Sequence, residues 1–408
     1  MIRRHAGVAL AAGIALLAAA CGGGSGFSPP QGTATGGGGE LRVLAASSGT
    51  AETQALTKAI DAFNASGQGK AKLEIATDLN TQLTTALAGG NPPDVFYGQV
   101  EKIYDLVKAD ALAPVGDKVG TPVYPNLKAA FTVNGTYYCP PKDFSTLALQ
   151  VNDSMLAQAG VTPPKTWAEL RTAAEKLTTG GRVGLVMGDE LLRVLPFMLQ
   201  NGGYILSKDL TKATANTPQN AEALTYLKEM IDKGWVKSAK ELGAGWPGEA
   251  FGKQQAAMTL EGNWILGAMA KDYPSVKYSS VELPAGPKGK GTLSFTVCWA
   301  VAKATKNLDG AVALVKFLTS DKEQLALTEG FGPMPANPAL RDKWLQKYPQ
   351  AQAYIAGAQY ATTPVFPSGF KPVLDETNTQ IQRFFKGQAT PSQVLQSFDS
   401  AAAGVLGG

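Results

Sequence analysis

The sequence predicts an α/β protein with two lobes, each a mixed sheet flanked by helices. First, short strand-like segments alternate with amphipathic helical segments, an order typical of parallel or mixed sheets. Second, this alternation occupies two successive stretches of the chain. Third, the 408 residues can supply two or three folding units, and a hydrophobic content of 44% is too high for a disordered chain.

The first stretch covers residues 40–97. In the helix predicted over 50–66, Leu56, Ile60 and Phe63 recur at helical spacing and form one apolar face. The expected strands are 40–45, 72–77 and 94–97, with a second helix over 80–88. In sheets of this order, ligands bind in the loops beyond the carboxyl ends of the strands.

The second stretch begins near residue 147. Thr166 and Glu169 match a capping box, which predicts a helix from there to about Leu177. The further expected strands are 147–151, 182–187, 255–260 and 292–302, and the further expected helices are one beginning at Thr217, then 307–318, 375–386 and 390–405. The boundaries follow from local patterns alone, so we expect shifts of a few residues.

The N-terminus reads as a signal peptide, residues 1–20. Arg3 and Arg4 form a basic start, and the uncharged run 6–20 ends in small residues. That run is too short for a comfortable membrane span, which needs about 20 residues. No later segment approaches that length, so we expect the body to be soluble.

Cys21 follows the small residues and resembles the cysteine of a bacterial lipobox, although Ala18 stands where leucine is common. This resemblance implies that Cys21 is lipidated and becomes the first residue of the mature chain. The alternative is an ordinary secreted protein with a chance cysteine. Residues 21–39 are rich in glycine and carry no charge, which predicts a flexible tether.

Charge and histidine content exclude several classes of function. Lys+Arg 37 against Asp+Glu 33 is close to balance, so nucleic acid is not an expected partner. His5 is the one histidine, and it lies in the predicted signal peptide. The mature chain would then lack imidazole, which excludes Ser-His-Asp and Cys-His catalysis and histidine-ligated metals. We expect no metal and no cofactor.

Several short motifs occur in a characteristic order along residues 40–408. They are NPPDV at 91–95, NGTYY at 134–138 with Pro140, LALQVN at 147–152, PPKTWAEL at 163–170, FGKQQAAM at 251–258, GNW at 262–264 and GPMP at 332–335. Together they resemble the extracellular solute-binding proteins of ATP-driven sugar importers, the maltose-binding-protein-like family. The chain departs from that pattern at Gln150, where an aromatic residue is common, and at 296–299, where many members have a glycine-rich strand.

The resemblance implies a periplasmic-binding-protein-like clamp. A ligand would lie between two lobes joined by hinge crossovers, with lobe one at 40–141 plus 299–346 and lobe two at 142–298 plus 347–408. It further implies no enzymatic activity. We expect a monomeric substrate-binding subunit that delivers a mono- to oligosaccharide to the permease of an ABC importer, anchored through Cys21 to the outer face of the cytoplasmic membrane.

A sugar presents hydroxyls and apolar C–H faces, so its site needs carboxylates or amides together with aromatic rings. Asp143, just after the hinge proline, is the leading carboxylate; the alternatives are a salt bridge with Lys142 or a turn cap. Trp264 is the leading stacking platform, against a tryptophan packed within its lobe. The full set of candidates is Ser48, Tyr97, Gln99, Asp143, Trp246, Glu261, Asn263, Trp264 and Trp299.

Cys139 and Cys298 are the cysteines that remain after lipidation. The resemblance places them on neighbouring crossovers, and an oxidising envelope compartment would favour a disulfide between them. The alternative is two buried free thiols.

Two other functions stay open. The same fold could bind a polyamine or glycerol phosphate, although a phosphate ester calls for arginines and Arg193 is the arginine near a suitable loop. A secreted glycoside hydrolase could use Asp143 and Glu261 as its two carboxylates, but nothing in the sequence sets their separation.

Overall fold

The computed structural model describes residues 39–47 and 49–407. The predicted signal peptide 1–20, the predicted lipidation site Cys21, the tether up to residue 38 and the candidate Ser48 lie outside the described residues. Within the described part, no helix is both long and apolar enough to cross a membrane.

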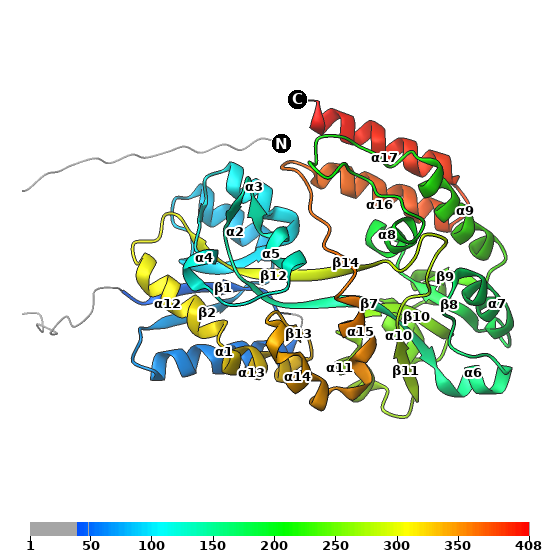
Figure 1. The fold of residues 1–408 in the computed structure, drawn as a ribbon, viewed down its shortest axis with the longest axis horizontal. Coiled ribbons are helices and arrows are strands. Elements are labelled where there is room, and N and C mark those ends of the chain that lie inside the picture. The colour runs from blue at the N-terminus through cyan, green and yellow to red at the C-terminus, as the bar shows by residue number, and fades with distance from the viewer. Residues whose placement is uncertain (1–38, 48, 408) are drawn as a thin grey trace, which may run out of the picture. The chain divides into compact units, whose positions relative to one another are not determined.

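A twelve-stranded mixed sheet runs through both lobes. The alternating pattern predicts a mixed sheet in each lobe, and the structure joins the two through β12 and β7. Its main path is β2 (Ala71–Ile75), β1 (Leu41–Ala45), β3 (Val95–Gln99), β12 (Thr292–Ala302), β7 (Pro141–Asn152), β10 (Ala256–Gly262), β8 (Val183–Met187) and β9 (Val236–Ser238). The strands of each outer group are parallel, whereas β12 and β7 run antiparallel to each other and to their outer neighbours. Figure 1 shows these two long strands passing between the lobes.

Short strands extend this sheet at its middle. They are β4 (Leu112–Ala113), β11 (Tyr278–Val281), β13 (Met334–Pro335) and β14 (Ala361–Thr362), and each pairs with β7 or β12. β5 (Thr132–Val133) and β6 (Thr136–Tyr137) form a separate two-stranded sheet. The two long strands therefore carry most of the connections between the lobes.

The first core surrounds the β2–β1–β3 end of the sheet. Leu56, Ile60 and Phe63 of α1 are buried in it, which confirms the predicted apolar face. Trp299, from the last part of β12, joins the same cluster. The helices of this region are α1 (Thr50–Ala65), α2 (Leu79–Ala88), α3 (Ile103–Lys108), α4 (Gly116–Val119), α5 (Pro125–Ala130), α12 (Leu308–Leu318) and α13 (Asp321–Phe331), with the short 3-10 helix η1 (Val100–Lys102).

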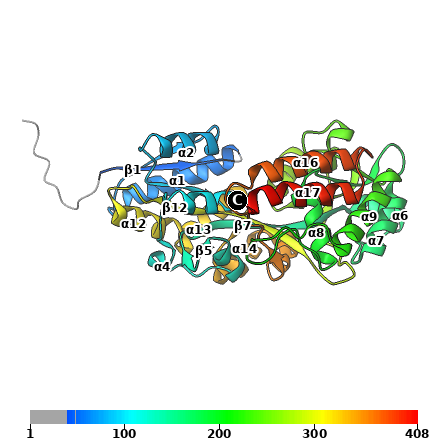
Figure 2. The ribbon, with the colours of Figure 1, turned by 90° about the horizontal axis from the view of Figure 1, so that it is seen from above.

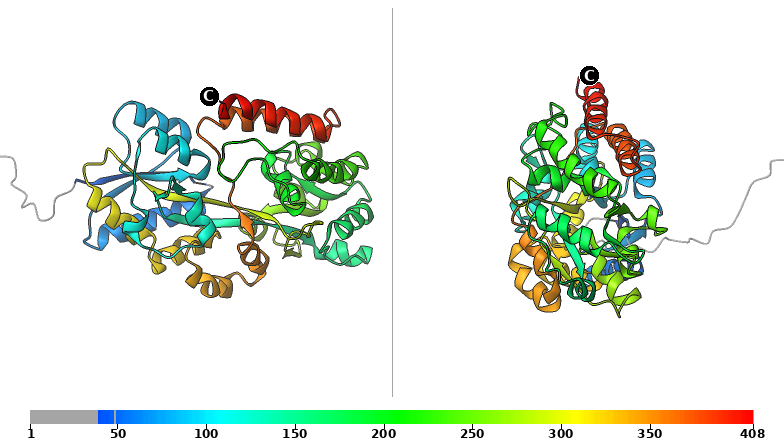
Figure 3. Two further views of the ribbon diagram at one scale, coloured as in Figure 1. Left: turned by 45° about the horizontal axis from the view of Figure 1, so that its top comes forward. Right: turned by 90° about the vertical axis from the view of Figure 1, so that its right-hand side faces the viewer.

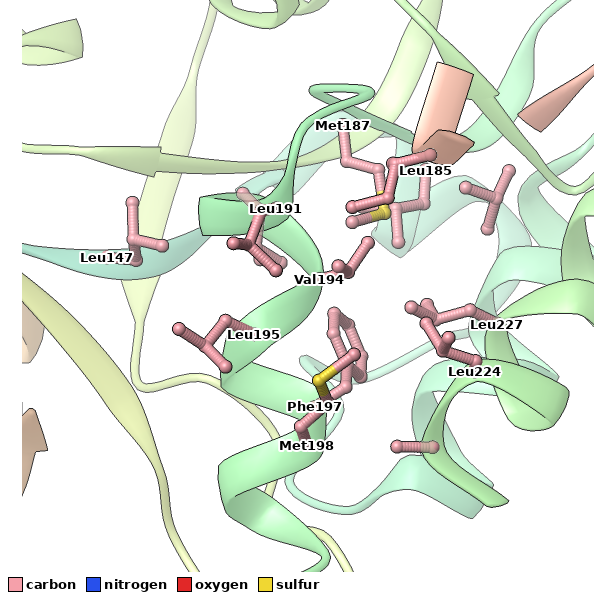
Figure 4. Packing of buried hydrophobic residues seen from close by; sticks show 14 of the residues in the cluster. Leu147, Leu185, Met187, Leu191, Val194, Leu195, Phe197, Met198, Leu224 and Leu227 are labelled. Carbon is pink, nitrogen blue, oxygen red and sulfur yellow. The ribbon is translucent and has the colours of Figure 1, made fainter. Parts of the chain in front are cut away.

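The second core surrounds the β10–β8–β9 end. The helices at this end of the sheet are α6 (Asp153–Ala159), α7 (Trp167–Leu177), α8 (Leu191–Gln200), α9 (Pro218–Asp232), α10 (Pro247–Gly252), α11 (Ile265–Asp272), α16 (Lys371–Phe385) and α17 (Pro391–Leu406), with η2 (Lys240–Leu242). Leu191, Leu195 and Met198 recur at helical spacing along α8, and Leu224 and Leu227 of α9 belong to the same cluster (Figure 4). Figures 2 and 3 show α16 and α17 side by side over this core.

A third, smaller cluster covers one face of β7. Phe144 and Ala148 of β7 pack with Met334, Trp344 and Tyr354. The last two belong to α14 (Arg341–Lys347) and α15 (Gln352–Gly357), and η3 (Pro338–Leu340) and η4 (Pro349–Ala351) flank these helices. Thr146 and Gln150 of β7 share this face. The Thr146 hydroxyl donates to the Tyr354 carbonyl oxygen at 2.8 Å, and the Gln150 amide donates to the Tyr354 hydroxyl at 2.7 Å, so α15 covers this face of the crossover strand.

The predicted capping box at α7 forms only in part. The hydroxyl of Thr166 accepts the N–H of Glu169, as expected, but the Glu169 carboxylate accepts the N–H of Lys165 at 2.6 Å. The carboxylate reaches one residue further back than a capping box requires. A complete capping box occurs instead at α17, between Thr390 and Gln393.

Candidate functional site

The face of the paired strands β7 and β12 opposite to the third cluster carries two polar and two apolar side chains. Asp143 and Ser145 lie two residues apart on β7, so they share a face opposite to that of Phe144. Val297 and Phe295 of β12 pair directly with them and are half-buried. We call Asp143, Ser145, Phe295 and Val297 the hinge face. A group of charged side chains lies at each end of it.

The lysine cluster consists of Glu52, Tyr97, Lys142 and Asp143. The ammonium of Lys142 lies 2.8 Å from Glu52 Oε1 and 2.7 Å from Asp143 Oδ2. The Tyr97 hydroxyl donates to Glu52 Oε1 at 3.2 Å, and Lys142 Nζ lies 4.8 Å from the centre of the Tyr97 ring. The Lys142 side chain is 2% exposed, so these contacts replace the water that a lysine would otherwise need.

Opposing effects set the charges in the lysine cluster. Burial by itself would lower the pKa of Lys142, but the neighbouring Asp143, Tyr97 and Glu52 raise it above its ordinary value, so the amine stays charged. Burial raises the pKa of Asp143 even though Lys142 opposes the shift. Burial likewise raises the pKa of Tyr97, which keeps the hydroxyl protonated as a donor.

A disulfide joins the two crossovers directly behind the lysine cluster. Cys139 and Cys298 are bridged, with their Cα atoms 5.7 Å apart, and this confirms the predicted bond. Gly98 of β3 pairs with Cys298, and a Cβ at Gly98 would lie 2.6 Å from the Cys298 sulfur. Tyr97 meets the Trp299 ring edge-on, with 5.0 Å between ring centres. The disulfide, the strand pairing and the ring contact therefore connect the crossovers to β3.

The arginine cluster consists of Arg193, Glu261, Trp264 and Phe295, at the other end of the hinge face. The Trp264 indole N–H donates to Glu261 Oε2 at 2.7 Å, and Arg193 Nη2 donates to the same oxygen at 3.4 Å. The guanidinium carbon lies 5.5 Å from the centre of the Trp264 ring and 5.6 Å from that of Phe295. The two rings meet nearly at right angles. Aromatic faces and hydrogen-bonding groups are thus combined in one place.

Glycines make this arrangement possible. A Cβ at Gly262, which ends β10, would lie 2.2 Å from the Trp264 ring, so only glycine lets the indole fold back across the strand end. A Cβ at Gly188 would lie 2.8 Å from Glu190 Oε1 and 2.9 Å from Arg193 Cγ. Packing against Trp264 therefore explains why the second residue of Glu-Gly-Asn-Trp at 261–264 is a glycine.

Burial dominates the ionisation of Glu261, which is 1% exposed. It raises the pKa of the carboxyl, while the charge of Arg193 and the hydrogen bond from Trp264 lower it by less. Glu190, whose carboxylate lies 3.6 Å from the Arg193 guanidinium, has the same negative charge as Glu261. Repulsion between the two carboxylates adds to the upward shift of the Glu261 pKa. A carboxylate in this position is costly unless its partners are kept.

Most of the predicted site residues lie in or beside these two clusters. Tyr97 and Asp143 belong to the lysine cluster, Trp299 adjoins it, and Glu261 and Trp264 belong to the arginine cluster. The main chain of Asn263 donates to Ser145 Oγ, and Gln99 pairs with Val297 at the edge of the hinge face. Trp246 packs instead with a separate apolar cluster of Phe251, Ile265, Met269 and Val276.

Sequence reasoning did not select five residues of this region as site residues: Glu52, Lys142, Ser145, Arg193 and Phe295. The sequence suggests Lys142 only as a salt-bridge partner of Asp143, and the structure contains that salt bridge. Arg193 stood out as the arginine near a suitable loop. Nothing in the local sequence pairs Glu52 with a lysine 90 residues away.

Other features of the described residues do not compete with this site. Two surface hollows lie along β1 and β2, and they share no lining residue with either cluster. Among the residues that the structure describes, no group of three or more acidic, cysteine or histidine side chains could hold a metal ion. We take the hinge face as the candidate binding site because aromatic rings and hydrogen-bonding groups meet at it.

The sequence profile of the family described as bacterial extracellular solute-binding proteins matches residues 58–353, well over half of the chain. The chain belongs to this family. A solute-binding protein captures its ligand without transforming it, so the site is one of binding and not of catalysis. This membership also confirms the extracellular assignment at the level of the family.

Two curated relatives are similar over most of their length. A diacetylchitobiose binding protein of Streptomyces coelicolor is 26% identical over 372 residues, 87% of each chain. A maltodextrin-binding protein of Bacillus subtilis is 26% identical over 308 residues, 68% of this chain and 69% of the relative.

Solved structures of this class share the fold. A substrate-binding protein of Listeria monocytogenes in complex with cycloalternan matches with a TM-score of 0.79 at 24% identity, over 90% of this chain and 99% of the other. The sugar-binding protein MalE of Xanthomonas citri matches with a TM-score of 0.80 at 19% identity, over 90% and 98%. These likenesses confirm the two-lobed periplasmic-binding-protein fold.

Proposed function

We propose that this protein is the substrate-binding subunit of an ABC importer, and that it captures a sugar of one to several units against the hinge face between its lobes. The observation that carries the proposal is the arginine cluster. Trp264 and Phe295 offer aromatic surface for the C–H face of a sugar, and Arg193 and the buried Glu261 contact the Trp264 ring. Asp143 and Ser145 add hydrogen-bonding groups further along the hinge face.

The names of similar proteins support a carbohydrate ligand. The relatives named for diacetylchitobiose and maltodextrin and the solved neighbour that holds cycloalternan all bind sugars. We propose that the lobes comprise 40–141 plus 299–346 and 142–298 plus 347–408, and that they close around the ligand. Closure would signal occupancy to the membrane permease.

We further propose that a lipid on Cys21 anchors the protein to the outer face of the cytoplasmic membrane. The charge-free segment 21–39 would then act as the tether between the anchor and the folded body. Labelling the expressed protein with a radioactive or clickable fatty acid tests this, with Cys21→Ser as the control. Label in the control protein at the wild-type level would overturn the anchor.

A thermal-shift screen over mono-, di- and trisaccharides tests the choice of ligand. A ligand at 100 times its Kd adds about 2.7 kcal/mol to the free energy of unfolding and raises Tm accordingly. We expect at least one sugar to raise Tm in the wild-type protein and to have a much smaller effect in Trp264→Ala. A shift with a polyamine or glycerol phosphate, and with no sugar, would replace the sugar by that solute.

A chemical assay separates binding from hydrolysis. We expect di- and oligosaccharides to be recovered intact after prolonged incubation with the protein. Release of products that depends on Asp143 and Glu261 would contradict a pure binding role and favour a glycoside hydrolase.

A further inference from the structure

The orientation of the Trp264 indole is fixed by several contacts of different kinds. Its N–H donates to Glu261 Oε2 at 2.7 Å, and Glu261 is 1% exposed and so cannot easily move. Phe295 meets the indole with 5.5 Å between ring centres and 81° between ring planes. Gly262 leaves the space into which the ring folds.

Arg193 touches both Trp264 and the group that holds it. Its guanidinium lies over the Trp264 and Phe295 rings and donates to the Glu261 oxygen that also accepts the indole N–H. The side chain is 12% exposed. It also sits in the first turn of α8, where the partial positive charge of a helix N-terminus disfavours a cation. Burial and the helix N-terminus both disfavour the arginine charge here. The guanidinium contacts Trp264, Glu261, Phe295 and Glu190.

We propose that Arg193 and Glu261 are positioning residues, which hold the Trp264 indole in its ligand-stacking orientation before any ligand binds. The inference rests on the proposed function, in which Trp264 stacks on a sugar. A side chain that is already ordered loses little conformational freedom on binding, so the pair would strengthen affinity without touching the ligand. Loss of that preorganisation should weaken binding by roughly 3- to 10-fold.

The test begins with the protein free of any sugar. The chain contains 6 tryptophans, so 5-fluorotryptophan labelling gives a small set of fluorine resonances, and Trp264→Phe identifies the one from Trp264. In the wild-type protein we expect this resonance to be single and sharp. In Arg193→Met and in Glu261→Met we expect it to broaden, split or shift towards the position of a solvated indole.

Conservative and control variants separate positioning from general damage. Glu261→Gln keeps an oxygen that can accept the indole N–H, so we expect it to preserve a single Trp264 resonance even if Glu261→Met fails to fold. Arg193→Lys keeps the charge and should restore part of the order that Arg193→Met loses. The matched control is Arg171→Met, which removes an arginine paired with a glutamate at 3.2 Å on the exposed surface of the same lobe. It should leave the Trp264 resonance unchanged.

Sugar binding supplies the second readout, by calorimetry with the best sugar from the thermal-shift screen. The proposal expects Arg193→Met to bind every sugar more weakly by a similar factor, alongside a disordered Trp264 resonance. An unchanged resonance in both methionine variants would overturn it. A loss of affinity confined to sugars with a carboxylate, with Trp264 still ordered, would also overturn it, since Arg193 would then contact the ligand. If no sugar binds at all, the proposed function fails, while the fluorine spectra still decide whether Trp264 is positioned.

Discussion

Glu261 shows how burial and pairing compete at a single carboxylate. Burial raises its pKa above the ordinary value of 4.5, and Arg193 and Trp264 only partly oppose that shift. A raised pKa means that the folded protein binds the proton more tightly than the unfolded chain does. The contribution of Glu261 to stability is therefore fully present below about pH 4.5 and is lost as the pH rises through the folded pKa.

This leads to a pH prediction with a matched variant. We expect the free energy of unfolding of the wild-type protein, minus that of Glu261→Gln, to fall as the pH is raised from about pH 4 to about pH 8. Each unit by which the folded pKa exceeds the unfolded value adds about 1.4 kcal/mol to the fall. Urea unfolding followed by fluorescence measures both proteins. A difference that stays constant with pH would show that Glu261 keeps its ordinary pKa.

Gly98 is a second residue whose type is explained by its neighbours, because a side chain there would clash with the disulfide. We expect Gly98→Ala to cost about 1 to 3 kcal/mol of unfolding free energy, because its Cβ would lie 2.6 Å from a sulfur held by the disulfide. The cost should shrink in a Cys139→Ala, Cys298→Ala background, which a double-mutant cycle measures. Gly267→Ala is the control, since nothing lies within 4 Å of a Cβ there. An equal cost in both backgrounds would mean that the sulfur is not the cause, and would point to the Ala300 Cβ, which lies 3.1 Å from the added carbon.

At the scale of elements, one contact joins α3 to the segment that leads into α16. Asp105 Oδ1 accepts the hydroxyl of Ser368 at 2.7 Å and the N–H of Gly369 at 2.8 Å. Leu106, the next residue of α3, belongs to the first core, and Phe370 belongs to the second. The contact therefore bridges the two cores at a point away from the strands β7 and β12.

We expect Asp105→Ala to favour a more open arrangement of the lobes. Its effect on the free energy of unfolding should be small, below about 1 kcal/mol, because the carboxylate is partly exposed. Small-angle X-ray scattering should give a larger radius of gyration for the unliganded variant, and sugar affinity should fall. Asp117→Ala, which removes an exposed pair with Lys128 at 3.0 Å, is the control and should change neither. Identical scattering for Asp105→Ala and wild type would leave Asp105 with no part in closure.

The elements differ in how well local sequence predicts them. The sequence predicts α1 and α9 because their apolar residues recur at helical spacing. Thr217 also marks the start of α9, which it caps. α8 was not predicted. Pro196 lies inside it, and proline normally ends or kinks a helix because it lacks an N–H. Burial of Leu191, Leu195 and Met198 in the second core outweighs that local cost.

At the scale of the whole molecule, the disulfide closes a long loop. Cys139 and Cys298 are 159 residues apart, and the chain-entropy model assigns such a closure about 5 kcal/mol. We expect a non-reduced sample of the mature protein, with Cys21 lipidated, to contain no free thiol when titrated in denaturant, and we expect reduction to lower the melting temperature markedly. The Cys139→Ser, Cys298→Ser variant should reproduce the reduced protein. Two reactive thiols in the non-reduced sample would contradict the bridge.

Local order along the chain is enough to predict the signal-like start at 1–20, the alternation of strands and helices, and a family pattern that implies the clamp and the cysteine pair. It also selected several residues of the site, among them Asp143, Glu261 and Trp264. The contacts that hold these side chains depend on tertiary packing. Lys142 contacts Glu52, which is 90 residues away in the sequence, and Arg193 contacts Glu261, which is 68 residues away. These contacts depend on the order of strands in the sheet and on the packing of α1 and α8 against it. The local periodicity of the sequence does not predict that order.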